Sequence, residues 1–375
     1  MGLVSFFADV SSEMLYPLIP IFLTAVLGAP VAIVGIIEGA AEATASLLRT
    51  VSGRLSDLSG RRRPYVLAGY TLSALAKPLL ALAVGWPLVL VTRVIDRFGK
   101  GIRSSPRDAL LADSVDAQYR GRAFGWHRAM DTAGAIIGPL LALGLLMLLH
   151  HQLRLIFLLA FIPGIIGAAL VLFVREQRHP VPVTVPRLRF RALPPAFRGY
   201  LLAWGVFAIA NSSDVFLILC AKQLGFSTTL VVMLYTFYNV IYALASPYLG
   251  HLSDVLGRRR VLVGGLLVFA LVYVGFAVVP EAIWLWPLFA IYGLYIAATD
   301  GVGKAYAVDL VPSGIRASAI GLLGTLTGIA TLIASSVAGL LWQVVAPWAA
   351  FAYGALGALL GSLLLWRLPA TPHTD

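Results

Sequence analysis

Apolar stretches of about 20 residues follow one another along almost the whole chain, with only short polar segments between them. A helix that crosses a bilayer needs roughly 20 mainly apolar residues. Proline, glycine and charge boundaries mark twelve such stretches, at about 3–27, 31–52, 64–84, 87–105, 122–148, 153–174, 200–221, 227–248, 261–280, 283–303, 315–342 and 347–366. We therefore predict an all-α integral membrane protein with 12 transmembrane helices and no attached soluble domain.

The composition agrees with a membrane protein. Of the 375 residues, 59% are hydrophobic and 12% are charged, whereas charged residues make up about 25% of a soluble domain. The net charge of +11 would suggest a nucleic-acid partner in a soluble protein, but membrane proteins keep an excess of Lys and Arg on their cytoplasmic side. We expect no nucleic-acid partner. The single cysteine, Cys220, allows no internal disulfide and supplies no metal-ligand cluster, so we expect neither a metal nor a cofactor.

Basic residues gather in alternate loops, which predicts the orientation of the chain. The loops after spans two, four, six and eight contain many arginines, whereas the opposite loops hold little beyond Lys222 and Arg154. Both termini are therefore predicted to be cytoplasmic, in a multi-pass protein of the plasma (inner) membrane. The first segment reads as a span and not as a signal peptide, because no basic leader precedes it and two acids interrupt its apolar core.

One string occurs twice and divides the chain into halves. GRLSDLSGRRR at 53–63 recurs as GHLSDVLGRRR at 250–260. A repeat of half the chain length predicts two six-helix units with the same topology, with the binding site where the units meet. We place the N-terminal bundle at 1–174, a basic, proline-rich cytoplasmic linker at 175–199 and the C-terminal bundle at 200–375.

Both copies of this string resemble the signature of the major facilitator superfamily, Gly-x-Leu-x-Asp-x-x-Gly-Arg-(Lys/Arg), after spans two and eight. The matching residues are Gly53, Leu55, Asp57, Gly60, Arg61 and Arg62 in the first copy, and Gly250, Leu252, Asp254, Gly257, Arg258 and Arg259 in the second. The resemblance covers the whole chain. It implies two pseudo-symmetric six-helix bundles and transport by alternating access. It also implies that this loop holds the halves together on the cytoplasmic face until the cavity opens inward.

Two further features resemble the drug:proton antiporters of that family. Gly134, Gly138 and Pro139 in span five are similar to the antiporter motif Gly-x-x-x-Gly-Pro, although small residues four apart are also a general device for helix packing. The spacing of Pro17 and Pro20 resembles the first helix of these antiporters. Because Pro17 has no N–H for the carbonyl four residues before it, we expect the first span to be interrupted there.

Four acids lie in the first two spans, where hydrocarbon would otherwise surround them: Asp9, Glu13, Glu38 and Glu42. An ionised carboxylate at the bilayer centre costs roughly 2.5–3.5 kcal/mol or more, and protonation would relieve that cost. We predict that these acids carry protons, with Glu13 and Glu42 foremost because both lie near the middle of their spans. The alternative is that they pair with buried bases and only brace the bundle. The available partners are Arg49, Lys77, Arg93, Arg97, Lys100 and His127, the last one turn from Asp131.

The second half is aromatic where the first half is acidic. Tyr235 and Asn239 occupy the repeat positions of the span-two acids, and Tyr235, Tyr238 and Tyr242 form a stripe along span eight. Such a stripe is more often packing than a substrate wall. In span seven, Asp214 echoes the central acid of span one if the repeat register slips by one turn. Acids together with aromatic rings suit an organic cation, so we predict substrate contacts from Glu13, Asp214, Tyr235, Tyr238 and Asn239.

Span four departs from the family pattern and keeps a second hypothesis open. Ile95 stands where the motif Arg-x-x-x-Gly-x-Gly places its arginine, and Arg93 and Arg97 flank it. Either arginine is a candidate substrate ligand, and with Lys100 they suit an anionic metabolite. In span ten, Asp300 and Lys304 lie one turn apart and are predicted to compensate each other.

The leading hypothesis is a proton-coupled exporter of a small organic substrate, cationic or lipophilic. Glu13, with Glu42 or Asp9, would take a proton from outside and release it inside as the substrate leaves. Alternatives are a proton symporter for an anionic metabolite, an exporter of divalent metals and a non-transporting receptor. No phosphate-binding loop, metal-ligand spacing or Ser/His/Asp motif is evident in the sequence, so we predict that the protein is not an enzyme. We expect a monomer whose partners are the substrate, protons and lipid.

Overall fold

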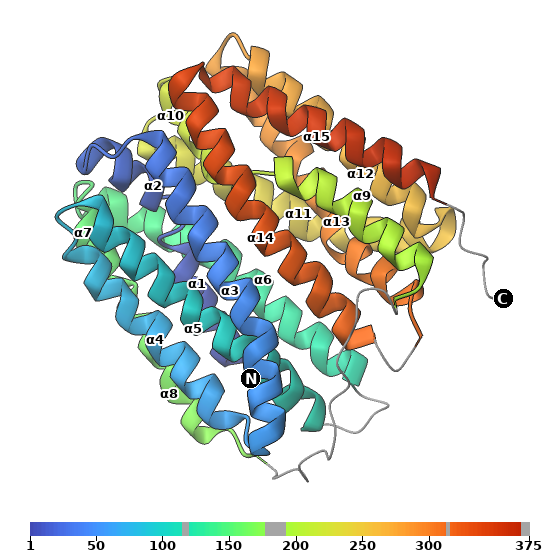
Figure 1. The fold of residues 1–375 in the computed structure, drawn as a ribbon. Coiled ribbons are helices and arrows are strands. Elements are labelled where there is room, and N and C mark those ends of the chain that lie inside the picture. Colours follow the sequence, from blue (N-terminus) through green and yellow to red (C-terminus); the bar gives the residue numbers. More distant parts are fainter. Residues whose placement is uncertain (115–119, 177–192, 313–315, 369–375) are drawn as a thin grey trace. The chain divides into compact units, whose positions relative to one another are not determined.

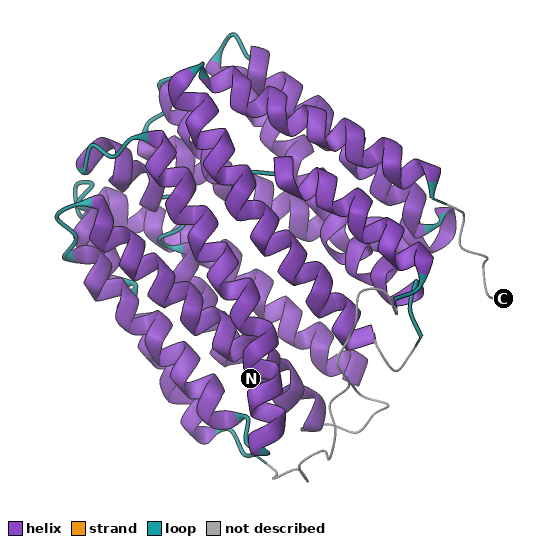
Figure 2. Cartoon of the chain, viewed as in Figure 1, coloured by secondary structure: helices purple, strands orange, loops and turns teal. Residues whose placement is uncertain are grey.

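The computed structural model describes residues 1–114, 120–176, 193–312 and 316–368. Every regular element in these ranges is helical (Figure 2). The described chain divides into two compact units, which we describe separately. Unit 1 contains 1–176 together with Phe226–Thr236, and unit 2 contains 193–225 together with 237–368. The predicted bundle boundaries stay a prediction, and most of the predicted linker lies outside the described residues.

Unit 1 is built from long helices that pack side by side (Figure 1). Helix α5 packs against α3 and α4, and α1 packs against α6 and α8. The elements of unit 1 are α1 (Gly2–Glu13), α2 (Ile19–Ile21), the π-helical turn η1 (Phe22–Val26), α3 (Val31–Ser59), α4 (Arg63–Ala81), α5 (Trp86–Asp113), α6 (Arg120–Leu148), α7 (Leu153–Leu159), α8 (Phe161–Leu170) and the 3-10 turn η3 (Val171–Phe173).

Unit 2 follows the same plan. Helix α12 packs against α13 and α15, and α9 packs against α14 and α15. Its elements are α9 (Pro195–Ala210), α10 (Val215–Gln223), α11 (Thr228–Leu256), α12 (Arg258–Val278), the 3-10 turn η5 (Ala282–Trp284), α13 (Leu285–Asp309), α14 (Arg316–Val344) and α15 (Pro347–Arg367). The first turns of α11, through Thr236, belong to unit 1, and the rest of this helix belongs to unit 2.

Nine helical segments in the described ranges are long and apolar enough to cross a membrane. They correspond to nine of the predicted spans. The other three predicted spans are the broken α1–α2 segment, α4, and the highly charged α5. These helices are compatible with the predicted count of 12. Several run past the predicted ends, because a helix continues after its apolar stretch leaves the bilayer: α3 extends to Ser59 and α11 to Leu256.

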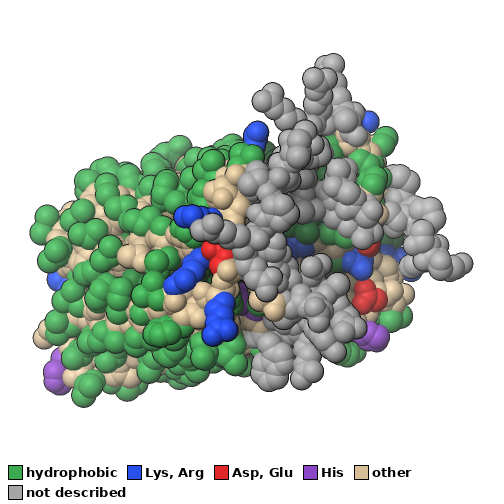
Figure 3. All heavy atoms as spheres, turned by 90° about the horizontal axis from the view of Figure 1, so that it is seen from below, with side chains coloured by type: hydrophobic (Ala, Val, Ile, Leu, Met, Phe, Trp, Pro, Cys, Tyr) green, Lys and Arg blue, Asp and Glu red, His purple; other side chains and the backbone are tan. Residues whose placement is uncertain are grey.

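The surface of the described residues suits a lipid environment. Large apolar side chains are exposed along the helices, among them Leu244 at 76% and Leu148 at 73%. In the space-filling view, hydrophobic side chains cover most of the left-hand surface, whereas Lys and Arg gather toward the middle of that face (Figure 3). Apolar side chains on the outside suit helices that cross a membrane many times. Only helices and closed barrels satisfy their backbone groups within lipid.

Candidate functional site

The first span is broken at its central acid. Helix α1 ends at Glu13, and α2 does not begin until Ile19. In between, Leu15 donates to the Ser12 carbonyl and Leu18 to the Leu15 carbonyl, each at three-residue spacing. Pro17 lies inside this irregular segment, where its missing N–H interrupts the helical ladder. The predicted interruption is therefore present, and it places the Glu13 carboxylate at a helix end deep in the sequence of the span.

Glu13 is held by a neutral donor. The Tyr235 hydroxyl donates to the Glu13 carboxylate at 2.6 Å, and the ring of Tyr16 lies 5.4 Å from the ring of Tyr235. Both acids of α1, Asp9 and Glu13, are half-buried. Neither takes part in an ion pair within the described ranges. The described residues thus give neither carboxylate a fixed counter-charge.

Glycines of α6 bring this helix against both acids. A Cβ added at Gly134 would lie 3.0 Å from the Asp9 Cβ, and one added at Gly138 would lie 2.9 Å from the Glu13 Cβ. It would also lie 2.8 Å from the Val10 carbonyl oxygen, so no larger side chain fits without moving α1. Gly134 and Gly138 therefore serve helix packing, as small residues four apart commonly do, and the seam they form runs beneath Asp9 and Glu13. The adjoining Pro139 is buried.

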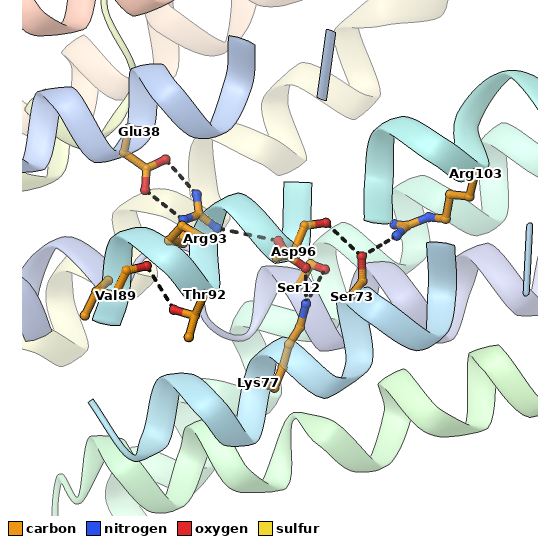
Figure 4. Close-up of polar contacts among 9 residues, drawn as sticks. All are labelled: Ser12, Glu38, Ser73, Lys77, Val89, Thr92, Arg93, Asp96 and Arg103. Carbon is orange, nitrogen blue, oxygen red and sulfur yellow. Dashed lines mark hydrogen bonds and ion pairs between the residues drawn. The ribbon is translucent and has the colours of Figure 1, made fainter. Parts of the chain in front are cut away.

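The acid of α3 nearest its start is locked in a buried network (Figure 4). The Arg93 guanidinium donates to both oxygens of Glu38, at 3.0 and 2.7 Å, and each of these side chains is only 6% exposed. Arg93 also lies 3.8 Å from Asp96, which accepts from Lys77 at 2.6 Å. Glu38 and Arg93 thus have the bracing arrangement that the sequence left open as the alternative to proton transfer or substrate binding.

A small pocket opens beside this network. It has an empty volume of about 270 Å³ and lies between α1, α4 and α5. Its polar lining consists of Ser12, Lys77, Thr92, Arg93 and Asp96. Because its charged residues already pair with one another, the pocket offers hydrogen-bond partners and little unbalanced charge.

Glu42 on α3 and the bases Arg97 and Lys100 on α5 interact electrostatically without a direct ion pair among the described residues. Glu42 is half-buried and interacts electrostatically with Arg97, Lys100 and Arg49. Arg97 is only 9% exposed, yet the described residues give it no hydrogen bond or ion pair within contact distance. Of the two span-four arginines that flank Ile95, Arg93 is therefore committed to carboxylates and Arg97 is available.

Unit 2 repeats the device of an acid at a broken helix. Helix α9 ends at Ala210, α10 begins at Val215, and Asp214 is the residue just before α10. The Tyr292 hydroxyl donates to Asp214 at 2.6 Å and the Tyr238 hydroxyl at 2.9 Å. The break has no proline. Serine side chains bond to the backbone instead, as when Ser335 accepts from the Ser213 N–H at 3.1 Å, an interaction that competes with helical hydrogen bonds.

The tyrosine stripe of α11 provides hydroxyl groups that donate to carboxylates. Tyr235, Tyr238 and Tyr242 donate to Glu13, Asp214 and Asp300 respectively. Asn239 lies half-buried on the same helix. Sequence patterning favoured packing for this stripe, since ring spacing says nothing about where a hydroxyl points. Tyr292 was missed because no periodicity singles it out. The predicted pair of Asp300 and Lys304 is confirmed, at 2.6 Å.

The repeated loop string forms tight turns at its glycines. Gly60 has φ +62° and Gly257 has φ +92°, backbone conformations that suit glycine. In the second copy, Arg258 pairs with Asp309 at 2.8 Å and lies 3.6 Å from Asp254. Gly250 faces open space, whereas a Cβ on Gly53 would lie 3.1 Å from Ser105.

In the first copy, the backbone N–H groups of Arg62 and Arg63 both donate to the Glu176 carboxylate. Arg61 is exposed. Asp57 lies within α3, but its side chain is outside the described part of the structure. The role that the resemblance implies for Asp57 in this loop therefore stays a prediction, and the observed anchor of this turn is Glu176.

These features define a multi-pass helical membrane protein with buried charges at interrupted helices, the organisation of a secondary transporter. The chain belongs to the Major Facilitator Superfamily, whose family model matches residues 1–219 and 199–375. An uncharacterized MFS-type transporter of Methanocaldococcus jannaschii is 36% identical over 97% of this chain and 93% of its own. The class G tetracycline resistance protein of Vibrio anguillarum is 28% identical over 76% of this chain and 73% of its own.

A solved structure shares the fold. The human organic anion transporter MFSD10 aligns with a TM-score of 0.72 at 17% identity, over 97% of each chain. The protein is thus a transporter of small molecules and not an enzyme.

Proposed function

We propose that this transporter exports a small organic substrate in exchange for protons, and that Glu13 is the principal proton carrier. The observation that carries the proposal is the state of Glu13. It lies at a helix break in the middle of the first span, and it accepts from a neutral hydroxyl without a described counter-ion. A carboxylate held in this way can be neutralised by a proton without leaving a base unpaired.

The contrast with Glu38 narrows the choice of carrier. Protonating Glu38 would remove the bidentate partner of the buried Arg93 guanidinium and leave it only Asp96 at 3.8 Å, and breaking a buried pair costs several kcal/mol. Glu13 and Asp9 carry no such penalty. Glu42 is intermediate, because it faces bases without contacting them.

The paired helix breaks support a transport role for both acids. Short or interrupted segments at corresponding positions of the two repeats are the best sequence-level pointer to the site of a transporter. Here the first span of each half is interrupted, and an acid lies at each break, Glu13 in unit 1 and Asp214 in unit 2. Asp214 is surrounded by tyrosine rings, which favours a cationic or lipophilic substrate. Resemblance to a tetracycline resistance protein also favours export.

One observation favours a second substrate class. Arg97 is a buried guanidinium without a direct partner among the described residues, and Lys100 is half-buried one turn away. Two such cations would hold the carboxylate or phosphate of an anionic metabolite. This would make the protein a proton symporter, with Arg97 as the substrate ligand.

The test uses everted membrane vesicles and reconstituted liposomes with a panel of organic cations and anions, ethidium and benzoate included. An antiporter accumulates substrate in vesicles with an acidic interior, whereas a symporter accumulates it when the outside is acidic. For the antiporter we expect Glu13→Gln to reduce gradient-driven accumulation at least about tenfold, with exchange between identical substrates retained. The control is Glu281→Gln, which removes an exposed carboxylate just before η5. Gradient-driven accumulation by Glu13→Gln at the wild-type rate would refute the assignment.

A further inference from the structure

A buried histidine connects the acids of α1 to one end of unit 1. His127 on α6 lies with its Nε2 atom 2.8 Å from the Ser5 hydroxyl of α1. Its other ring nitrogen, Nδ1, lies 3.6 Å from Asp131, one turn further along α6. His127 and Ser5 are almost fully buried, at 5% and 1% exposure. Spacing along the chain indicated that His127 and Asp131 are neighbours, but it did not indicate Ser5, because Ser5 and His127 are 122 residues apart.

The grouping continues toward the middle of the span. Asp131 interacts electrostatically with Asp9, and Asp9 with Glu13. Asp131 lies three residues before Gly134, the glycine that packs against Asp9, and residues three or four apart share a helix face. One oxygen of Asp131, Oδ1, is buried without a hydrogen-bond partner in the described structure. That oxygen is an acceptor still available on a residue that interacts with Asp9.

The order of these groups along α1 gives them a direction. Ser5, Asp9 and Glu13 are spaced four residues apart, so each step covers about 6 Å along the helix axis. His127 is beside the first of the three, near the start of α6, and Asp131 is beside the second. The start of α1 is the end of unit 1 that the charge distribution assigns to the cytoplasm.

We propose that Asp131 and His127 form the inner branch of a proton path that empties Glu13 and Asp9 toward the N-terminal end of α1. This inference rests on the proposed proton coupling. The proton leaves the carboxyl group of Asp9 for the carboxylate of Asp131, which passes it to Nδ1 of His127. The imidazolium then gives its Nε2 proton to the Ser5 oxygen while the Ser5 hydroxyl passes its own proton to water at that end, which leaves the ring neutral with its proton on Nδ1. The ring returns to the Nε2–H tautomer before it accepts the next proton.

The surroundings of His127 suit a transfer site. Ser5 also contacts the Tyr70 hydroxyl at 3.1 Å and accepts from Arg107 at 3.2 Å. Because a guanidinium can only donate, Arg107 occupies one lone pair of Ser5 and leaves the other, with the hydroxyl hydrogen, for His127 and Tyr70.

The charged groups that act on His127 come from several elements. They are Arg107 and Asp108 on α5, Asp131 on its own helix, and the amino group of Met1. Arg107 and Asp108 pair with each other at 2.9 Å, which leaves Asp131 as the neighbouring acid without a base in the described ranges. A proton on His127 therefore has the Asp131 carboxylate on one side and the Ser5 hydroxyl on the other.

The test compares His127→Gln, Asp131→Asn and the control His251→Gln, whose side chain is exposed near the end of α11. All are reconstituted in liposomes with ethidium as the probe, or with benzoate if the wild type prefers the anion. We expect His127→Gln and Asp131→Asn to reduce gradient-driven transport at least about tenfold, and to leave exchange between identical substrates within about twofold of wild type. The control should match wild type in both assays.

Three outcomes would overturn the relay. Gradient-driven transport by His127→Gln at the wild-type rate would refute the relay. Equal loss of both activities means that His127 only braces α1 against α6. Loss in Glu13→Gln without loss in His127→Gln or Asp131→Asn leaves the proposed function standing and refutes the path. If His127→Gln does not fold, Asp131→Asn carries the same test, since Oδ1 has no partner to lose.

Discussion

At the residue scale, unit 1 contains two kinds of charged side chain: those held in ion pairs and those without a fixed partner in the described structure. Glu38, Arg93, Asp96 and Lys77 satisfy one another through short contacts and have no spare charge. Removing two ions from water costs more than an average pair returns, unless the geometry is bidentate and the remaining positions are bonded. Arg93 meets that requirement on Glu38. The fixed network therefore provides a rigid wall, against which Asp9 and Glu13 can change their charge.

Loss of Arg93 should destabilise the protein far more than loss of an exposed partner. Arg93→Ala leaves Glu38 buried without its base, while Asp96 keeps Lys77, and we expect a cost of about 3–5 kcal/mol in unfolding free energy. Lys304→Ala breaks the half-exposed pair with Asp300 and should cost less than about 1 kcal/mol. Denaturant unfolding of the purified proteins in detergent measures both. Equal costs would show that the Glu38–Arg93 pair is not desolvated as described.

The sequence located these charges but not their partners. Acids within apolar stretches are visible in one dimension, and so are the arginines around Ile95. Pairing depends on which faces of two helices meet: Glu38 and Arg93 are 55 residues apart. Local spacing did find the pair of Asp300 and Lys304, because residues four apart on one helix are always neighbours.

At the element scale, the position of α1 depends on how closely α6 approaches it. Gly134 and Gly138 allow backbone contact at the level of Asp9 and Glu13, while Pro17 ends the helix just beyond. Sequence patterning predicted the helices well, since apolar length alone defines a span. It could not decide between packing and an antiporter role for the glycines, because the answer depends on what lies opposite them.

Gly138→Ala should displace α1, whereas Gly144→Ala on the same helix should be tolerated. The added Cβ of Gly138→Ala meets the Val10 carbonyl oxygen at 2.8 Å and the Glu13 Cβ at 2.9 Å, whereas Gly144 has nothing within 4 Å. Overpacking of this kind costs about 1–3 kcal/mol. The thermal unfolding temperature and the rate of gradient-driven transport should both fall for Gly138→Ala and stay at wild-type values for Gly144→Ala. Equal stability and transport of Gly138→Ala and Gly144→Ala would contradict the close packing of α6 against α1 at Gly138.

At the scale of the whole molecule, the two halves share a plan but differ in chemistry. Each begins with an interrupted span that carries an acid, and each contains the loop string with a glycine at positive φ. Unit 1 pairs Glu38 with a base and places bases near Glu42, whereas unit 2 surrounds Asp214 with tyrosines. The repeat could be read from the sequence because the two copies of the loop string are nearly identical. Matching Glu13 to Asp214 required a shift of one turn in the repeat register, and the helix break at each acid accounts for that shift.

The orientation in the membrane, predicted from the distribution of arginines, can be tested by labelling introduced cysteines while the single native cysteine stays in place. Cys220 is buried, so the wild type should not react with a membrane-impermeant maleimide. Gln152→Cys introduces an exposed thiol in a loop that holds few bases, and His251→Cys places one beside the arginine-rich turn at Gly257. We expect labelling of intact cells at position 152 only, and labelling at position 251 after permeabilisation. The reverse pattern would put both termini outside, and the proton path from Glu13 through His127 would then lead out of the cell.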